Sequence, residues 1–364
     1  MSMTGSPVTM TGSGLALQIR GLRVTARRGG RSIQILRDLD LDLRSGEILG
    51  VVGESGSGKS TLCRAIARLL PGGLVAESGT IRMGDVDVLG IRPGQLHRMP
   101  SRGVRMVFQN PMTALNPVMT VGGQCTEAAR AGRRMTRAEA LARSVEILQR
   151  MGIKNAASRM NDYPHEFSGG QRQRIVVSIA LAGEPAVLLA DEPTSALDVS
   201  TQAGLLDLIR EVCAEHHTAV IFVSHNYAVV SQLCSRVLVL YAGQAMELGP
   251  SAALLTQSRH PYTAALIASL PSVETRVPRL PAIPGQPPGV GEAPGGCPFR
   301  PRCRYADDGC RSAPMVMREV APGHQTSCMR ADVIWARRGG DDSTGQAHGG
   351  DGSTGQAHGG GSSA

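Results

Sequence analysis

Apolar residues follow two different patterns along this chain. Leu39, Leu41 and Leu43 alternate with charged residues, which is the period of a strand with one face in water. Further short strands are predicted over 15–25, 32–36 and 80–89, the last as a hairpin around Gly84-Asp85. Four other runs are almost entirely apolar, at 48–52, 104–108, 186–190 and 219–223. Runs of this length are typical of strands that are covered on both faces, so the chain predicts an α/β fold.

Between 110 and 162 the pattern changes to helix. Thr136 and Glu139 have the spacing of a capping box, and Gly152 is placed to end the segment. Three apolar positions are expected to share the buried face of this helix: Leu141, Val145 and Leu148. The simplest interpretation is a helical insertion within an α/β domain.

A glycine-rich loop lies between the apolar run 48–52 and a helical pattern over 61–70. It consists of Gly53, Glu54, Ser55, Gly56, Ser57, Gly58, Lys59, Ser60 and Thr61. The glycines let backbone N–H groups converge at the start of a helix, which attracts phosphate. Lys59 would reach the β- and γ-phosphates and Ser60 would bind Mg²⁺. The alternative is a glycine-rich loop that binds nothing, but the full pattern in its strand-to-helix context favours the phosphate site.

A second helix start could also bind an anion. Ser168 can cap it, while Gly169 and Gly170 leave the first N–H groups uncovered and Gln171 follows. Because Ser-Gly-Gly is a weak signal, an ordinary capped helix is the better explanation of this segment by itself.

Acidic and imidazole groups follow two of the apolar runs. Asp191 and Glu192 come after the run at 186–190, where the first could hold Mg²⁺ and the second could activate a water molecule. His225 follows the run at 219–223. Ligands of open α/β sheets bind at strand ends, although solvated turn acids and a structural histidine are the ordinary alternatives.

The motifs, taken in order, resemble those of the ATPase subunits of ABC transporters. The matching segments are Gly53–Ser60 (Walker A), Gln109 (Q-loop), Ser168–Gln171 (signature), Val187–Asp191 (Walker B), Glu192 (catalytic glutamate), Ser195–Asp198 (D-loop) and His225 (switch histidine). The resemblance implies a P-loop ATPase domain over 15–270, with a mixed sheet core, an antiparallel β-subdomain and a helical subdomain over about 110–170.

This resemblance also implies how ATP is handled. In the family, the Walker A loop of one subunit and the signature helix of its partner enclose one ATP in a head-to-tail dimer. Glu192 would then polarise the attacking water, His225 would contact the γ-phosphate, and Gln109 would link Mg²⁺ to the membrane subunits. The implied ligands of Mg²⁺ are Ser60, Gln109 and Asp191, and Asp198 would lie at the nucleotide. One departure concerns adenine, because Ala26-Arg27-Arg28 occupies the place where the family usually has an aromatic residue.

A narrower resemblance is to the oligopeptide/dipeptide importer branch. It is carried by the segments 109–117, 163–167 and 260–263 and by the C-terminal extension over 271–335. It implies two membrane-spanning permease subunits, an extracytoplasmic substrate-binding protein, and a second ATPase subunit that we expect to be a different chain. It places the protein at the cytoplasmic side of the cell membrane, as a peripheral subunit. Peptide import would be driven by ATP-dependent closure of the dimer.

Four of the eight cysteines gather in the C-terminal extension: Cys297, Cys303, Cys310 and Cys328. The branch resemblance suggests that they hold a [4Fe–4S] cluster. Zn²⁺ is the alternative metal, and the simplest interpretation is that the four thiols bind no metal. The other four, at 63, 125, 213 and 234, are interpreted as core packing residues. Residues 271–296 are rich in proline and glycine, which is typical of a linker or of an irregular docking arm.

Charge and composition leave one rival function. The 364 residues carry a net charge of +8, which would suit a soluble ABC ATPase that acts on DNA or ribosomes. Against this rival, the chain has one cassette and no basic run that would follow phosphates, so we expect no nucleic-acid partner. No apolar run is long enough to cross a membrane, and residues 1–14 do not resemble a secretion signal. That segment and the repeats over 336–364 are expected to be disordered.

Overall fold

The structure is a computed structural model that describes residues 14–28, 31–92, 103–131, 135–194, 199–270 and 282–341. The chain divides into two compact units, residues 1–329 and 330–364. The second unit contributes one described helix, α10 (Ala331–Asp341). Within the described ranges, no helix combines the length and the apolar character needed to span a bilayer. Disorder is predicted over 1–14 and 336–364, of which residues 1–13 and 342–364 lie outside the described residues. For residues 336–341 the prediction is wrong, because they continue α10.

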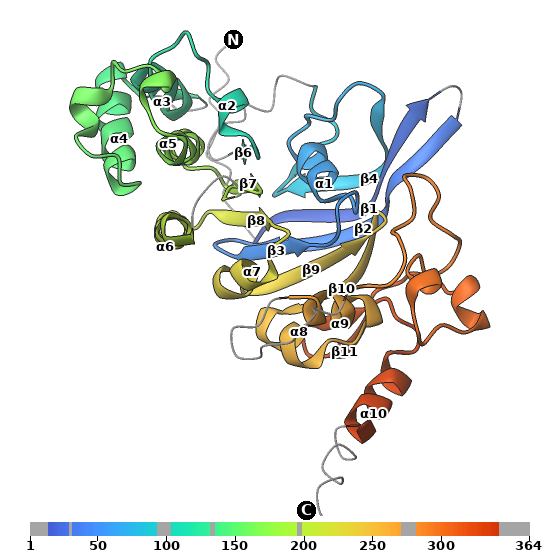
Figure 1. Ribbon diagram of the computed structural model, residues 1–364. Coiled ribbons are helices and arrows are strands. Elements are labelled where there is room, and N and C mark those ends of the chain that lie inside the picture. Colours follow the sequence, from blue (N-terminus) through green and yellow to red (C-terminus); the bar gives the residue numbers. More distant parts are fainter. Residues whose placement is uncertain are drawn as a thin grey trace, which may run out of the picture. The chain divides into compact units, whose positions relative to one another are not determined.

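A mixed sheet forms the core of the first unit (Figure 1). Among the described residues it has eight strands in the order β11-β12-β10-β9-β3-β8-β7-β6. Their bounds are β3 (Ile48–Val52), β6 (Val104–Val107), β7 (Val187–Asp191), β8 (Ala219–Val223), β9 (Arg236–Tyr241), β10 (Gln244–Pro250), β11 (Arg318–Ala321) and β12 (His324–Thr326). The five strands from β9 to β6 are parallel, and the others are antiparallel. Every residue of β3, β7 and β8 is buried, which explains their continuous apolar runs.

An antiparallel sheet in the order β2-β1-β4-β5 forms the second layer. Its strands are β1 (Leu15–Arg28), β2 (Arg31–Arg44), β4 (Leu74–Met83) and β5 (Val86–Asp87). The separate short strands expected before residue 44 are two long ones. Leu39, Leu41 and Leu43 are buried while Asp40 is exposed, so the predicted one-sided strand is confirmed.

Two apolar cores lie on opposite faces of the main sheet. Leu49 and Val51 of β3 join a cluster with α1 (Lys59–Ile66) and the antiparallel sheet. Ile48 and Val52 join the other cluster, because successive side chains of a strand point to opposite faces. That cluster includes α5 (Gly169–Ala182), α6 (Val199–Glu215) and α7 (Tyr227–Leu233). Cys63, Cys125, Cys213 and Cys234 are all buried, as expected of packing residues.

The helical insertion is present, with α2 (Pro111–Ala114), α3 (Val121–Arg130), α4 (Arg137–Arg150) and the 3₁₀ turns η2 (Ala156–Arg159) and η3 (Pro164–Glu166). The capping box of Thr136 and Glu139 is confirmed. The prediction that Leu141 faces the core is wrong, because its exposed fraction is 45%. The buried residues of α4 are Ala140, Ser144, Ile147 and Leu148. Ser144 can occupy this face because its hydroxyl donates to the carbonyl of Ala140 at 2.6 Å.

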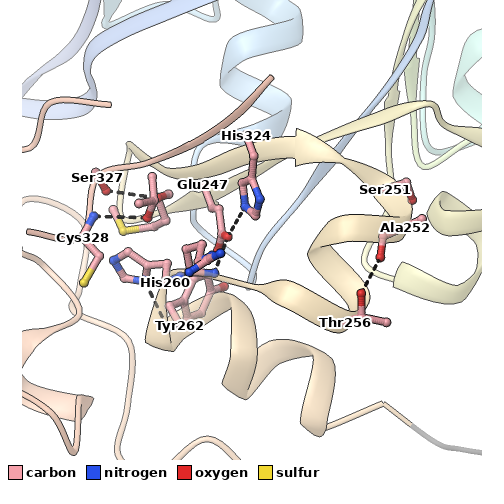
Figure 2. A network of polar contacts seen from close by, with 12 residues as sticks. Glu247, Ser251, Ala252, Thr256, His260, Tyr262, His324, Ser327 and Cys328 are labelled. Carbon is pink, nitrogen blue, oxygen red and sulfur yellow. Dashed lines mark hydrogen bonds and ion pairs between the residues drawn. The ribbon is translucent and has the colours of Figure 1, made fainter. Parts of the chain in front are cut away.

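The C-terminal extension is docked on the main sheet. Helices α8 (Ser251–Gln257) and α9 (Pro261–Ala268) precede it, and η4 (Arg300–Arg302) and η5 (Asp308–Arg311) lie within it. Its strand β12 pairs with β10. Figure 2 shows the polar contacts at this junction, where buried Glu247 accepts the N–H groups of Arg259 (2.6 Å) and His260 (3.0 Å). The Nε2 atom of His324 lies 2.7 Å from the same carboxylate. Residues 282–296 contain no helix or strand, and 271–281 lie outside the described residues.

Candidate nucleotide site

The predicted site residues follow the carboxyl ends of four neighbouring parallel strands. The glycine-rich loop follows β3, Gln109 follows β6, Asp191 ends β7 with Glu192 next, and His225 follows β8. In open α/β sheets this edge is where ligands bind. Segments separated by more than a hundred residues therefore reach one place.

The glycine-rich loop is shaped by positions that need glycine. Gly53 has φ of 151° and lies so close to β9 that a Cβ atom would be 2.1 Å from the carbonyl oxygen of Leu240. Gly58 is the N-cap of α1 in the left-handed conformation, with φ of 105°, and supplies no side-chain cap. A helix start without a side-chain cap leaves its N–H groups available to an anion.

Lys59 points back over this loop. Its Nζ atom donates to the carbonyl oxygens of Gly53 (2.7 Å) and Glu54 (2.9 Å) and lies 3.4 Å from Ser57 Oγ. Burial lowers the pKa of Lys59, while the neighbouring carboxylates of Glu192 and Asp191 oppose this shift. An ammonium group desolvated in this way is placed to bind phosphate oxygens at the centre of the loop.

Ser60 and Asp191 form a pair of oxygen ligands. The Ser60 hydroxyl donates to Asp191 Oδ1 at 3.0 Å. Burial raises the pKa of Asp191, and the hydrogen bond from Ser60 opposes this shift. A hydroxyl and a carboxylate on adjacent elements fit the all-oxygen coordination of Mg²⁺. Gln109, also expected to bind Mg²⁺, donates instead to Glu192 Oε2 at 2.7 Å.

Glu192 is the point at which three of the predicted residues meet. Besides the contact with Gln109, its Oε1 atom lies 3.3 Å from Nδ1 of His225. Its backbone is left-handed, with φ of 50°, and its N–H donates to the carbonyl of Val223 at 3.0 Å. Left-handed non-glycine residues are uncommon and concentrate at functional sites. The side chain of His225 is 69% exposed, whereas that of Glu192 is 19% exposed.

The second helix start, at α5, has a different construction. Ser168 Oγ accepts the N–H of Gln171 (3.3 Å), and the Gln171 side chain accepts the N–H of Ser168 (3.0 Å). The predicted cap is therefore a closed capping box. A Cβ atom added at Gly169 would meet no atom within 4 Å, so the helix start is open to its surroundings. Asp198, with the rest of the segment 195–198, lies outside the described residues.

Comparison with known proteins matches both parts of the chain. Residues 36–195 match the ABC transporter family and residues 246–310 match the C-terminal region of oligopeptide/dipeptide transporters. A putative peptide import ATP-binding protein of Brucella melitensis is 41% identical over 88% of this chain and 98% of its own length. The oligopeptide transport ATP-binding protein OppD of Escherichia coli is 39% identical over 89% and 96%. The chain belongs to the ABC transporter ATPases. Within that family it falls in the oligopeptide/dipeptide branch.

Solved structures agree with this assignment. A dimeric ATP-binding cassette bound to ADP and phosphate has a TM-score of 0.57 and 26% identity, over 65% of this chain and 98% of that one. The expected P-loop ATPase fold is thereby confirmed, and the chain is an ATP-binding and ATP-hydrolysing subunit.

Sequence reasoning missed two residues that contact the Walker A loop and a third that supports them. Tyr262 accepts the N–H of Glu54 at 2.9 Å, and Arg302 pairs with the Glu54 carboxylate. Tyr241 bonds to Arg302 at 3.1 Å. Tyr262 lies within a motif typical of the branch, which could have marked it. No local pattern connects Arg302 to a loop almost 250 residues earlier.

The four clustered cysteines are half-buried: Cys297, Cys303, Cys310 and Cys328. The N–H of Cys297 donates to the carbonyl of Cys310 at 3.0 Å. Burial raises the pKa of Cys297 to about 11, with smaller contributions from nearby Cys303 and Cys310. Cys328 follows β12 instead, and its N–H donates to the hydroxyl of Thr326 at 3.2 Å.

The predicted metal site is not seen at these cysteines in the part of the chain that the structure describes. The described residues contain no group of three or more histidine, cysteine or acidic side chains arranged to hold a metal ion. The expectation that one cluster is ligated by all four thiolates is therefore not supported by the geometry: Cys297, Cys303, Cys310 and Cys328.

Proposed function

We propose that this ATPase drives the import of oligopeptides or dipeptides by closing on ATP together with a second ATPase subunit. The names of the full-length relatives support the peptide cargo. The nucleic-acid alternative receives no support from any comparison. In this proposal the ATPase acts at the cytoplasmic face of the membrane. It binds two permease subunits, and an external substrate-binding protein delivers the peptide to them.

The observation that carries the proposal is the presence of two different anion-binding helix starts. The start of α1 meets Lys59, Asp191 and Glu192 of its own chain, whereas the start of α5 is open at Gly169. A head-to-tail dimer would place the second start against a nucleotide held by the partner. The structures similar to this chain include dimeric cassettes.

Each residue then has a role that follows from its position. Lys59 and the N–H groups of α1 bind the phosphates, and Ser60 and Asp191 hold Mg²⁺, which neutralises charge on the phosphate oxygens. Glu192 accepts the proton of the attacking water. His225 orients the Glu192 carboxylate by contacting the oxygen that Gln109 does not bind. Gln109 couples binding of Mg²⁺ and ATP to the permease subunits. Asp198 lies outside the described residues, and its place at the nucleotide is proposed from the family resemblance alone.

Adenine is bound without the aromatic residue that the family usually provides. Ala26 occupies that place on β1 and pairs with Ile33 of β2. An arginine plane from Arg27 can substitute as a stacking surface. We therefore expect weaker discrimination between ATP and GTP than an aromatic stack would give.

The cysteine segment is proposed to hold a [4Fe–4S] cluster, with Zn²⁺ as the alternative. Thiolates are the ligands that both prefer, and three of the four lie close enough to influence one another. Iron and sulfide analysis of anaerobically purified protein tests this proposal. Zinc without sulfide would contradict the cluster, and protein free of both would contradict either metal.

A transport assay tests the whole proposal. In cells that lack this chain, a plasmid copy should restore uptake of a labelled dipeptide or oligopeptide. Glu192→Gln should bind ATP but lower hydrolysis by about a hundredfold or more, because the general base is lost, and should not restore uptake. Uptake that persists with Glu192→Gln would contradict the proposed role.

A further inference from the structure

The C-terminal extension contacts the Walker A loop through one arginine, Arg302, which pairs with Glu54. Two guanidinium nitrogens of Arg302 donate to the two carboxylate oxygens of Glu54, at 2.6 and 3.0 Å. The Arg302 side chain is only 4% exposed and that of Glu54 is 24% exposed. A bidentate pair of this kind is stronger and more directional than an ordinary surface ion pair.

The guanidinium is fixed on every side. Besides Glu54, it donates to Tyr241 Oη (3.1 Å) and to the carbonyls of Pro284 (2.8 Å) and Ile283 (3.4 Å). Its three nitrogens carry five N–H groups, which match these five contacts. Burial lowers the pKa of Arg302, but the hydrogen bonds that it donates to Glu54 and Tyr241 outweigh burial and raise the pKa overall. Lysine has neither the planar fork nor enough donors to make the same set of contacts.

The backbone of the same loop residue is held as well. The hydroxyl of Tyr262 accepts the N–H of Glu54 at 2.9 Å. The ring of Tyr262 packs with those of Tyr241 (4.6 Å between centroids) and Phe299 (5.3 Å). Phe299 is 2% exposed and lies three residues before Arg302. The carbonyl of Glu54 in turn accepts from Lys59, so that displacement of Glu54 displaces the phosphate-binding ammonium.

The extension also lies against the adenine side of the site. A Cβ atom added at Gly291 would be 2.5 Å from Cγ2 of Ile33. Ile33 is the cross-strand partner of Ala26, at the position where the family usually has its aromatic residue. The extension therefore contacts the nucleotide site at two separate places, the Walker A loop and the β1–β2 hairpin.

We propose that the C-terminal extension is a structural part of the nucleotide site and that Arg302 is its positioning residue. Arg302 holds Glu54, and through it Lys59, in the geometry that binds phosphate. Because such coupling is reciprocal, nucleotide in turn stabilises the extension. The inference rests on the assignment of the Walker A loop to ATP, and it does not depend on whether the cysteines hold a metal.

A double-mutant cycle tests this inference in the full chain. Arg302→Met and Glu54→Gln are each expected to raise the Kd of a fluorescent ATP analogue about tenfold, within the usual range of coupling between sites. Both should raise the KM for ATP, and Arg302→Met, which lies outside the Walker A loop, should leave kcat at saturating ATP within about twofold of wild type. The double variant should be no weaker than the single ones, because contacting residues are not additive. Arg302→Lys should not restore affinity.

The matched control is Arg300→Met, which removes the same charge from the same 3₁₀ turn. It should leave the Kd within about twofold of wild type, whereas a general effect of positive charge would change both arginine variants equally and overturn the inference. Equal affinity of wild type and Arg302→Met would also overturn it, as would additive effects in the double variant. If wild type itself bound no ATP, the assigned function would fail instead.

A second measurement separates positioning from loss of folding. In hydrogen exchange, ATP should slow exchange over residues 283–303 in wild type and in Arg300→Met. The same protection should be lost in Glu54→Gln, a change within the loop that leaves Arg302 in place. Retained protection in Glu54→Gln would contradict the coupling, even if Arg302→Met proved unstable.

Discussion

Helices α1 and α5 both begin with glycine-rich turns, yet their first turns are built differently. At α1 the N-cap is Gly58, no side chain caps the helix, and Lys59 lies over the loop. At α5 the Ser168–Gln171 capping box is satisfied within its own first turn. The first is assembled for phosphate by its own chain, and the second is a stable helix start capped by its own side chains. In the proposed dimer, this second start would complete the ATP site of another subunit.

The largest effect is expected from placing charge at the open α5 start. Gly169→Asp introduces a carboxylate where a Cβ atom meets nothing within 4 Å. It should repel a nucleotide held by the partner and lower ATPase activity of the assembled transporter at least tenfold. Stability should not fall, because an acidic residue in the first turn favours a helix. Kinetics and thermal unfolding measure the two effects.

The control for this variant is Gly169→Ala, which adds the Cβ atom without the charge and should retain most of the activity. ATP binding by the isolated subunit should be the same in wild type and Gly169→Asp. Weaker binding by the isolated Gly169→Asp chain would mean that α5 acts within its own subunit.

Acid is expected to lower the stability of the protein through His260, the residue that caps α9 beside the Walker A loop. Burial lowers the pKa of His260 to about 4, against an opposing effect of Glu247. The unfolded chain binds this proton near pH 6.5 and the folded chain does not. Stability is therefore complete above about pH 6.5 and falls by about 3 kcal/mol as pH drops toward about 4. His260 accepts the N–H of Tyr262, which holds Glu54.

Urea unfolding at several pH values measures this dependence. His260→Asn keeps an acceptor for the N–H of Tyr262 and removes the titrating group, so the slope between pH 6.5 and about 4 should be shallower. The control is His165→Asn, which makes the same substitution at an exposed histidine. It should leave the dependence of stability on pH as in wild type. Equal slopes in wild type and His260→Asn would show that another group governs acid sensitivity.

The smallest effect concerns the side-chain cap that α5 has and α1 lacks. Ser168→Ala removes the acceptor of the Gln171 N–H, which should cost about 1 kcal/mol of stability. Ser168→Gly should cost only a few tenths. Denaturant unfolding distinguishes them, and equal stability of wild type and Ser168→Ala would mean that the cap contributes nothing.

The sequence predicted the elements that carry a local pattern. Buried parallel strands gave unbroken apolar runs, and the loop after β3 kept a fixed spacing of glycine and lysine. The face of α4 was misjudged because a buried serine, Ser144, satisfies its hydroxyl within the helix and so takes a place that periodicity assigns to an apolar residue. Arg302 could not be found, because its partner Glu54 is brought close only by tertiary packing.

The cysteine cluster stays a prediction. Spacing alone could not show how the four thiols are presented, because Cys297 and Cys310 are brought together by a backbone hydrogen bond and Cys328 follows β12, which pairs with β10 of the main sheet.

The central claim is that one ATP is held by α1 of one subunit and α5 of the other. The most direct measurement is an experimental structure of the assembled transporter that carries Glu192→Gln, with ATP and Mg²⁺. The account predicts that Lys59 contacts the nucleotide of its own subunit and that Ser168 and Gly169 face the γ-phosphate of the nucleotide in the partner. A closed, ATP-filled transporter in which Ser168 lies far from every phosphate would contradict it.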